Sequence, residues 1–138
     1  MDNAVIGYGM FAAILLLIPL ANAQPILNST QLQTAIDKEV TDMKNDGDVL
    51  KAQINSTNLA HTGQVENLIN KVYYYEGKVS AVGGGTWAFL HDVQDTLLAK
   101  IKATGQSGFT AAELAAIDSF GNDVATSKQE HPSSNVFG

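Results

Sequence analysis

Few side chains in this sequence could carry out catalysis, and they are far apart. The 138 residues include three histidines, at positions 61, 91 and 131, and no cysteine or arginine. A hydrolase needs a nucleophile, a base and an orienting group within reach of one another, yet no nucleophile-elbow, zinc-protease or phosphate-loop motif occurs. His91 and Asp92 are adjacent, but adjacent residues on a helix do not face each other. We therefore expect that the protein is not an enzyme.

Ligands for metals and cofactors are equally sparse. A zinc site would need three distant histidines, because the chain has no thiolate. The acidic stretch around Gly47 lacks the residue order of a calcium-binding loop and is more typical of a solvated turn. Axial haem ligands must face each other from different elements, whereas His61 and Met43 belong to one predicted helix. We expect no metal and no cofactor.

The charge balance restricts the partners. Eight lysines stand against fourteen acidic residues, which gives a net charge of −6. Without arginine the chain has no bidentate group for phosphate or guanine, and a negative charge disfavours contact with phosphate backbones. We expect no nucleic acid. The expected partners are a membrane and protein subunits, including copies of this chain.

The N-terminal residues 4–23 carry no charge, and two interpretations fit them. As a retained transmembrane helix, they cover roughly 30 Å, the thickness of the hydrocarbon core. As a secretory signal, they end in a small-residue cleavage motif at Ala21 and Ala23, although the usual basic N-terminus is missing. Both interpretations place residues 24–138 outside the cytoplasm or at a membrane. The anchor side chains are Phe11, Ile14, Leu15, Leu16, Leu17, Ile18 and Leu20.

A long stripe of mostly apolar residues, the helical seam, follows this segment. Its steps alternate between three and four residues, as in a coiled coil or a long bundle helix. Thr30, with Gln33 as its capping partner, is expected to begin a helix that reaches residue 79. A kink is expected near 45–48, where Asn-Asp-Gly is turn chemistry, and Gly63 is a second weak point. The seam consists of Ile36, Val40, Met43, Leu50, Ile54, His61, Val65, Leu68 and Val72.

Two shorter helices are expected after the long one. The glycine run 83–85 lets the chain reverse, and a return helix would end at about Thr104, before Gly105. Thr110 and Glu113 form a capping box that starts a last helix, which would end at about residue 125.

The predicted class is all-α, because no stretch alternates with the period of two that strands require. The N-terminal hydrophobic segment, residues 1–23, precedes a helical body at 24–125. A polar, mobile tail is expected at 126–138.

Five aromatic residues surround the glycine run in sequence. Tyr and Trp are favoured where one end of the side chain is apolar and the other is wet. The cluster is interpreted either as a contact tip, which docks on a partner subunit or a bilayer, or as filling for the end of the protein's own core. The contact tip consists of Tyr73, Tyr74, Tyr75, Trp87 and Phe89.

Two tripeptides, Asn28-Ser29-Thr30 and Asn55-Ser56-Thr57, match the acceptor pattern for N-glycosylation. Such matches arise by chance in a chain this rich in Asn, Ser and Thr, so the pattern alone carries little weight.

Two functions fit these features. The first is a non-enzymatic structural or assembly subunit, anchored or exported through residues 1–23 and making helix–helix contacts in a virion membrane, a surface filament or a membrane complex. The second is a cleaved, secreted or periplasmic helical protein whose tip aromatics line a ligand pocket.

Overall fold

The computed structural model describes residues 26–132, which contain helices and connecting turns and no strand. The predicted all-α class is confirmed for this part of the chain. The predicted N-terminal helix, with its anchor residues and the cleavage motif, lies outside the described residues. No helix among residues 26–132 is long and apolar enough to span a bilayer. The helices are α2 (Ser29–Ser56), α3 (Gln64–Val82), α4 (Trp87–Thr104) and α5 (Ala111–Glu130), with short 3₁₀ turns η2 (Gly84–Thr86) and η3 (Gln106–Gly108).

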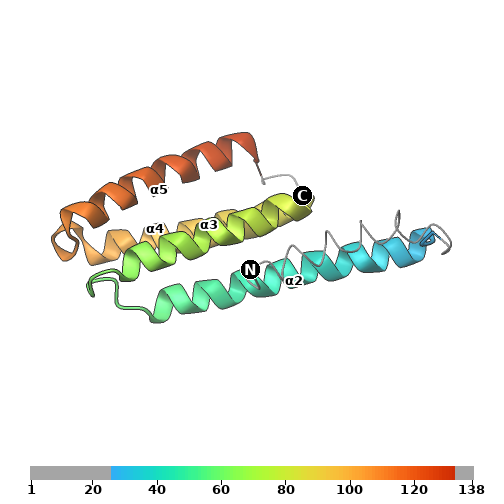
Figure 1. Cartoon of the computed structure of the whole chain (residues 1–138), viewed down its shortest axis with the longest axis horizontal. Helices are drawn as coiled ribbons and strands as arrows, with labels where there is room; N and C mark the ends of the chain where they lie inside the picture. The colour runs from blue at the N-terminus through green and yellow to red at the C-terminus, as the bar shows by residue number, and fades with distance from the viewer. Residues whose placement is uncertain (1–25, 133–138) are drawn as a thin grey trace.

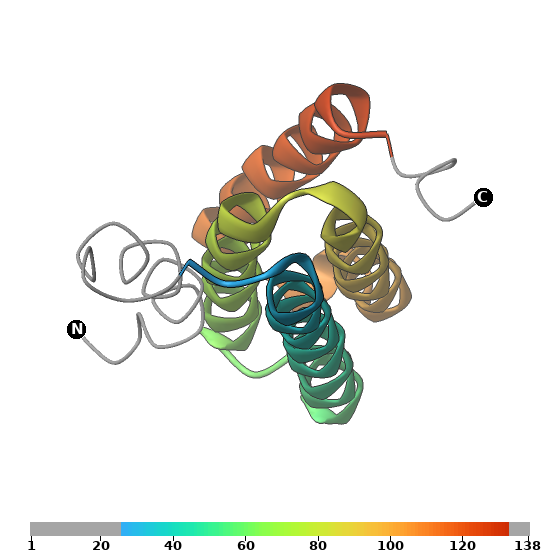
Figure 2. The same ribbon diagram turned by 90° about the vertical axis from the view of Figure 1, so that its right-hand side faces the viewer.

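The helices run up and down in chain order. Helices α2, α3 and α4 pack against one another as a three-helix bundle, and α5 packs mainly on α3 (Figure 1). Seen from the end, α5 lies on the side of the bundle away from α2 (Figure 2). The core between α2, α3 and α4 consists largely of seam residues from α2 and α3 and the apolar stripe of α4. Its fully buried members include Met43, Ile54, Val65, Val72, Leu90, Val93 and Leu97.

The sequence predicts one long helix over residues 30–79 with a kink near 45–48, and this position of the break is wrong. Helix α2 passes without interruption through 45–48, and the chain breaks at residues 57–63 instead. There the Thr57 hydroxyl donates to the carbonyl of Gln53 at 2.7 Å, and the Asn58 side chain accepts from the amide of Ala60. Gly63 has a φ of +85°, which favours glycine. These contacts end α2 and turn the chain, so the two halves of the seam fold back against each other.

Gly47 belongs to the interior of α2, not to a turn, because another side chain occupies the space beside it. The hydroxyl of Tyr75 donates to the carbonyl of Met43, one turn before Gly47. A Cβ at position 47 would lie 2.6 Å from the Tyr75 oxygen. Glycine at position 47 therefore lets α3 approach α2 closely. The glycine of this turn-like sequence is explained by helix packing and not by a turn.

The start of α2 also differs from the prediction. Asn28 is the N-cap, and its side chain accepts from the amide of Gln31 at 2.8 Å, while the Gln31 side chain accepts from the amide of Asn28. This capping box replaces the one expected between Thr30 and Gln33.

The end of α5 lies five residues beyond the expected one. The box of Thr110 and Glu113 starts α5 as predicted, but the helix continues to Glu130, through residues assigned to the tail. Two contacts with α4 explain the extension: Lys128 pairs with Asp95, and the ring of His131 stacks on Trp87.

Candidate functional site

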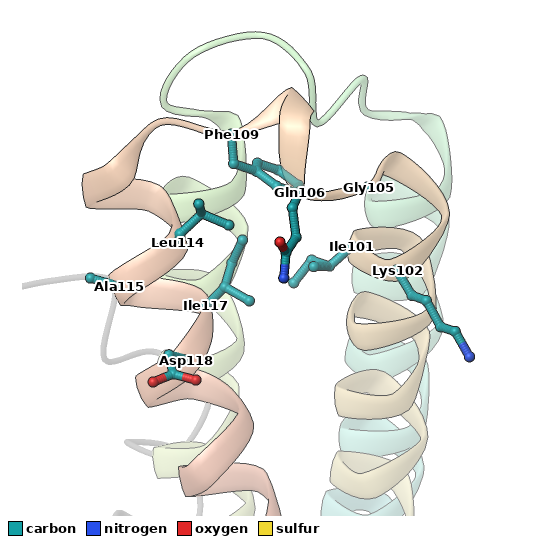
Figure 3. Close-up of a pocket in the computed structure, with 9 residues that line it drawn as sticks. All are labelled: Ile101, Lys102, Gly105, Gln106, Phe109, Leu114, Ala115, Ile117 and Asp118. Carbon is teal, nitrogen blue, oxygen red and sulfur yellow. The ribbon is translucent and has the colours of Figure 1, made fainter.

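An apolar groove lies between the end of α4 and the start of α5. Its volume is about 640 Å³, within the range of ligand and peptide sites. Ile101 from α4 and Leu114 and Ile117 from α5 point toward one another across it, and Phe109 lies at its closed end (Figure 3). We call this feature the α4–α5 groove; its remaining lining residues are Lys102, Gly105, Gln106, Ala115 and Asp118.

The groove lies where the first turns of α5 stand apart from α4, because α5 packs more extensively on α3 than on α4. Gly105, with a φ of +83°, ends α4, and η3 and the extended Phe109 carry the chain sideways. Further along α5, Phe120 meets Tyr73 of α3 edge to face, and the Tyr73 hydroxyl donates to Asp123 at 2.5 Å. Because α5 follows α3, its first two turns diverge from α4 and leave apolar side chains incompletely covered.

The polar groups of the groove lie at its borders. Lys102 extends away from the gap and Asp118 lies on the outer side of α5 (Figure 3). The amide of Gln106 reaches toward the gap from η3. Lys102 and Asp118 are the only charged lining residues and stand at the borders, so the surface between them is mostly apolar.

One end of the groove is joined to the α2–α3 connection through Glu113. One carboxylate oxygen of Glu113 accepts from the amide of Thr110 and the other from the amide of Gly63, both at 2.8 Å. These backbone donors hold the pKa of Glu113 below its usual value of 4.5. The charged carboxylate thus fixes the start of α5, and with it the position of Leu114 and Ile117.

The structure does not bring the five contact-tip residues together on one surface. Tyr75 is buried between α2 and α3, where burial raises the pKa of its phenol. Tyr73 packs on α5, and Trp87 stacks on His131. Phe89 is half-buried against the core, and Tyr74 is exposed, with Lys78 above its ring. They belong to several separate contacts inside the fold. Tyr74 and Tyr75 border a small hollow of about 250 Å³ whose lining does not include the other three.

The three histidines do not form one cluster, although His91 and His131 meet. His61 is exposed in the loop between α2 and α3. His91 is buried on α4, with Nε2 2.7 Å from the carbonyl oxygen of His131 and Nδ1 3.1 Å from the Gln94 side chain. Together with the stacked Trp87, this contact, the α4–α5 clasp, holds the end of α5 on the start of α4. No group of three or more potential metal ligands occurs among residues 26–132.

Charged residues on the α2–α4 face pair with one another. A second hollow of about 520 Å³ lies there. Lys51 pairs with Asp48 and Asp92, and Lys44 pairs with Asp48. Asp95, the remaining charged residue of this hollow, pairs with Lys128 of α5, so each of its charged side chains has an ion-pair partner.

Two buried polar atoms lack a hydrogen-bond partner within the described part of the chain: Oε1 of Glu39 and Oγ of Ser127. Burial raises the pKa of the Glu39 carboxyl. The two atoms lie on different helices and neither lines the groove, so they add nothing to a site there.

The sequence predicts that several of the lining residues face inward, but it does not predict that a groove lies between them. Ile101 and Ile117 occupy apolar stripe positions of two predicted helices, and Phe109 and Leu114 have the spacing of a hydrophobic staple around a helix start. Periodicity shows which residues face inward, but not that two helices diverge.

No protein-family model, curated protein or solved structure matches this chain.

Proposed function

We propose that this protein is a non-enzymatic structural subunit of an assembly at a membrane or cell surface, and that the α4–α5 groove receives an apolar helix of another subunit. Residues 1–23 anchor the chain or direct its export. The observation that carries the proposal is the position of an open apolar groove at the end of the bundle opposite the start of α2 (Figure 1).

The position of the groove suits a contact with a neighbouring subunit. Helix α2 has 28 residues, which at 1.5 Å per residue makes about 42 Å. The chain emerges from residues 1–25 at one end of α2, whereas the groove lies at the other end of the bundle. In an assembly where the bundle stands upright on an anchor at residues 1–23, the groove lies at the end of the bundle away from the bilayer, where a neighbouring subunit can reach it.

The lining of the groove favours a helix as its occupant. Ile101, Phe109, Leu114 and Ile117 form an apolar floor between two helices, and one lysine and one aspartate stand at its borders. An amphipathic helix places apolar residues in such a groove at positions i, i+3, i+4 and i+7. The two border charges are opposite in sign and leave the groove without net charge, so an uncharged or mixed-charge helix face fits it best.

The test measures assembly of the full chain, extracted in mild detergent, by light scattering after size exclusion. Wild type should elute as a complex larger than one chain, and Leu114→Gln should shift it to the monomer. The matched control is Ser119→Gln, an exposed position on the same helix outside the groove, which should leave the complex intact. A monomeric wild type, or equal behaviour of the two variants, would contradict the proposal. The composition of the complex tells whether the second subunit is another copy.

One observation supports a second candidate, a secreted ligand-binding protein. A volume of about 640 Å³ is large enough for a small apolar ligand, although the pocket is the groove and not the cluster of tip aromatics. The mass of the natively isolated chain separates the two candidates: a mature N-terminus at Gln24 favours secretion, and an intact Met1 favours an anchor.

A further inference from the structure

We propose that Asn55, at the end of α2, is an N-glycosylation site. The inference rests on the proposed export of residues 24–138, because the donor of the glycan is available to exported chains. It starts from a tripeptide pattern, but the structure adds three observations that the pattern lacks: the exposure of the site, the free state of the amide, and the position of the tripeptide at a helix end.

The Asn55 amide is available for reaction. Asn55 and Ser56 are exposed, and Thr57 is half-buried. The only hydrogen bond of Asn55 beyond those of its own helix uses its backbone carbonyl, which accepts from Lys100 at 2.7 Å. Its side-chain nitrogen has no partner within residues 26–132, so a modification there breaks no contact of the fold.

The tripeptide lies where the helix is easily opened. Helix α2 ends at Ser56, and Thr57 is its C-cap, in an extended conformation. The Thr57 amide reaches the carbonyl of Ile54 at 3.3 Å, a long bond. Terminal turns fray readily, and the loop at 57–63 follows directly. Presenting the hydroxyl of Thr57 together with the amide of Asn55 to a transferase requires opening this last turn, which breaks the bond from Thr57 to the Gln53 carbonyl.

The other asparagines of the described chain are explained or lack the pattern. Asn28 heads the same tripeptide, but its side chain is the N-cap of α2, which is a sufficient structural reason for an asparagine there. Asn58 organises the turn after α2. Neither it nor the helical asparagines at 45, 67, 70 and 122 have a serine or threonine two residues later.

The reaction is a glycosyl transfer from a polyprenyl-phosphate-linked oligosaccharide, the donor class that the proposal requires. The side-chain nitrogen of Asn55 attacks the anomeric carbon of the first sugar. A carbon–nitrogen bond forms, the bond from that carbon to the phosphate oxygen breaks, the nitrogen loses one proton, and the polyprenyl phosphate leaves with the bonding electrons. No oxidant or reductant takes part.

A glycan at Asn55 is compatible with the proposed assembly. The residues that line the groove belong to α4, α5 and the connection between them, and none belongs to α2. Helix α5 lies away from α2 across the bundle (Figure 2). The glycan would be attached outside the groove lining but at the same end of the bundle, because the Asn55 carbonyl accepts from Lys100, next to the lining residues Ile101 and Lys102.

The experiment maps the two tripeptides separately on the full chain isolated from the cells that make it. Because the chain has no arginine, lysine-specific cleavage places Asn55 on the peptide 52–71 and Asn28 on the peptide that ends at Lys38. We expect peptide 52–71 to carry a glycan mass, and enzymatic removal of the glycan by an amidase to leave aspartate at position 55. An unmodified peptide 52–71 overturns the inference, whatever the state of Asn28.

Substitutions test whether the added mass is attached at Asn55 rather than at a nearby residue. Asn55→Gln and Thr57→Val should abolish the added mass, whereas Thr57→Ser, which restores the hydroxyl, should retain it. Asn58→Gln is the matched control and should also retain it. Persistence of the glycan in Thr57→Val overturns the inference. Protease accessibility of residues 26–132 in intact cells is measured in parallel: an exported but unmodified chain refutes glycosylation alone, whereas a chain protected inside the cell refutes both the inference and the proposed export.

Discussion

Gly47 shows how one residue sets the distance between two helices. Glycine in a helix interior costs roughly 0.5–1 kcal/mol relative to alanine, so its place in the middle of α2 calls for a reason. The Tyr75 phenol supplies it, because its oxygen would lie 2.6 Å from a Cβ at position 47. The Tyr75 hydroxyl donates to the Met43 carbonyl, so this buried polar group has a hydrogen-bond partner.

We expect Gly47→Ala to destabilise the protein by about 1–3 kcal/mol, the usual cost of overpacking a core. The control is Gly77→Ala, an exposed helical position with nothing near its Cβ. That change should stabilise the protein by up to about 1 kcal/mol. Denaturant unfolding measures both. In a Tyr75→Phe background the cost of Gly47→Ala should shrink, and an unchanged cost would show that the phenol is not its cause.

Glu113 shows how one carboxylate can serve two parts of the chain. It closes the capping box of α5 and also accepts from Gly63, fifty residues earlier. The box was visible in the sequence as Thr110 and Glu113, but the bond to Gly63 was not, since nothing local connects a loop to a distant helix start.

The lowered pKa of Glu113 leads to an expected pH dependence. The folded state favours the charged carboxylate, so its contribution to stability is complete above the usual pKa of 4.5. That contribution is lost as the pH falls from there through the lower folded value. Glu113→Gln should reduce stability at neutral pH and flatten the decline below pH 4.5. Unfolding midpoints measured across this range test the expectation, and parallel curves for the two proteins would contradict it.

At the scale of the elements, the α4–α5 clasp decides how far α5 extends. The rings of Trp87 and His131 stack with centroids 3.6 Å apart and an interplanar angle of 2°. The carbonyl of His131 also meets His91. Local composition after residue 125 is polar and predicted a tail, but these contacts come from α4 and hold the last turn of α5 in place.

We expect His131→Ala to loosen the last turn of α5 without unfolding the bundle. A stacked ring pair contributes about 0.5–1.5 kcal/mol beyond area burial, so amide exchange near Ser127 should accelerate by roughly threefold to tenfold. Exchange near Phe120 should not change. Trp87 is the only tryptophan, so its fluorescence should change as well. The exposed Gln129→Ala is the control, and equal exchange in both variants would show that the stack does not hold the helix end.

The break between α2 and α3 is decided at the same scale. Two weak points were visible, Asn-Asp-Gly at 45–47 and Gly63, and the local turn chemistry of the first looked stronger. In the structure the chain breaks before Gly63 and not at 45–47. An uninterrupted α2 aligns Met43, Leu50 and Ile54 with the buried residues of α3 and α4. A chain that broke at residue 47 would lose this continuous contact.

At the scale of the whole molecule, the groove and the start of α2 lie at opposite ends of the bundle (Figure 1). The Leu114→Gln test of assembly depends on the fold surviving the change. Leu114 is only half-buried, so we expect its replacement to cost the isolated chain about 1 kcal/mol. Loss of the complex with a preserved unfolding transition would then report on the groove itself.

The sequence by itself determined the all-α class, most of the inward-facing positions, the end of α4 and the capped start of α5, whereas Ile36 and His61 of the predicted seam are exposed. These features follow from short-range causes: apolar spacing, glycine at helix ends and hydrogen bonds three or four residues apart. Tertiary structure alone decided which turn-like stretch stays helical, how far α5 runs, where the aromatic side chains pack, and that α4 and α5 diverge to leave a groove. Each of these depends on a contact between residues far apart in the chain, such as Gly47 with Tyr75 or Trp87 with His131. Local patterns do not encode the distances between helices, because those distances are set by which side chains meet once the helices are packed.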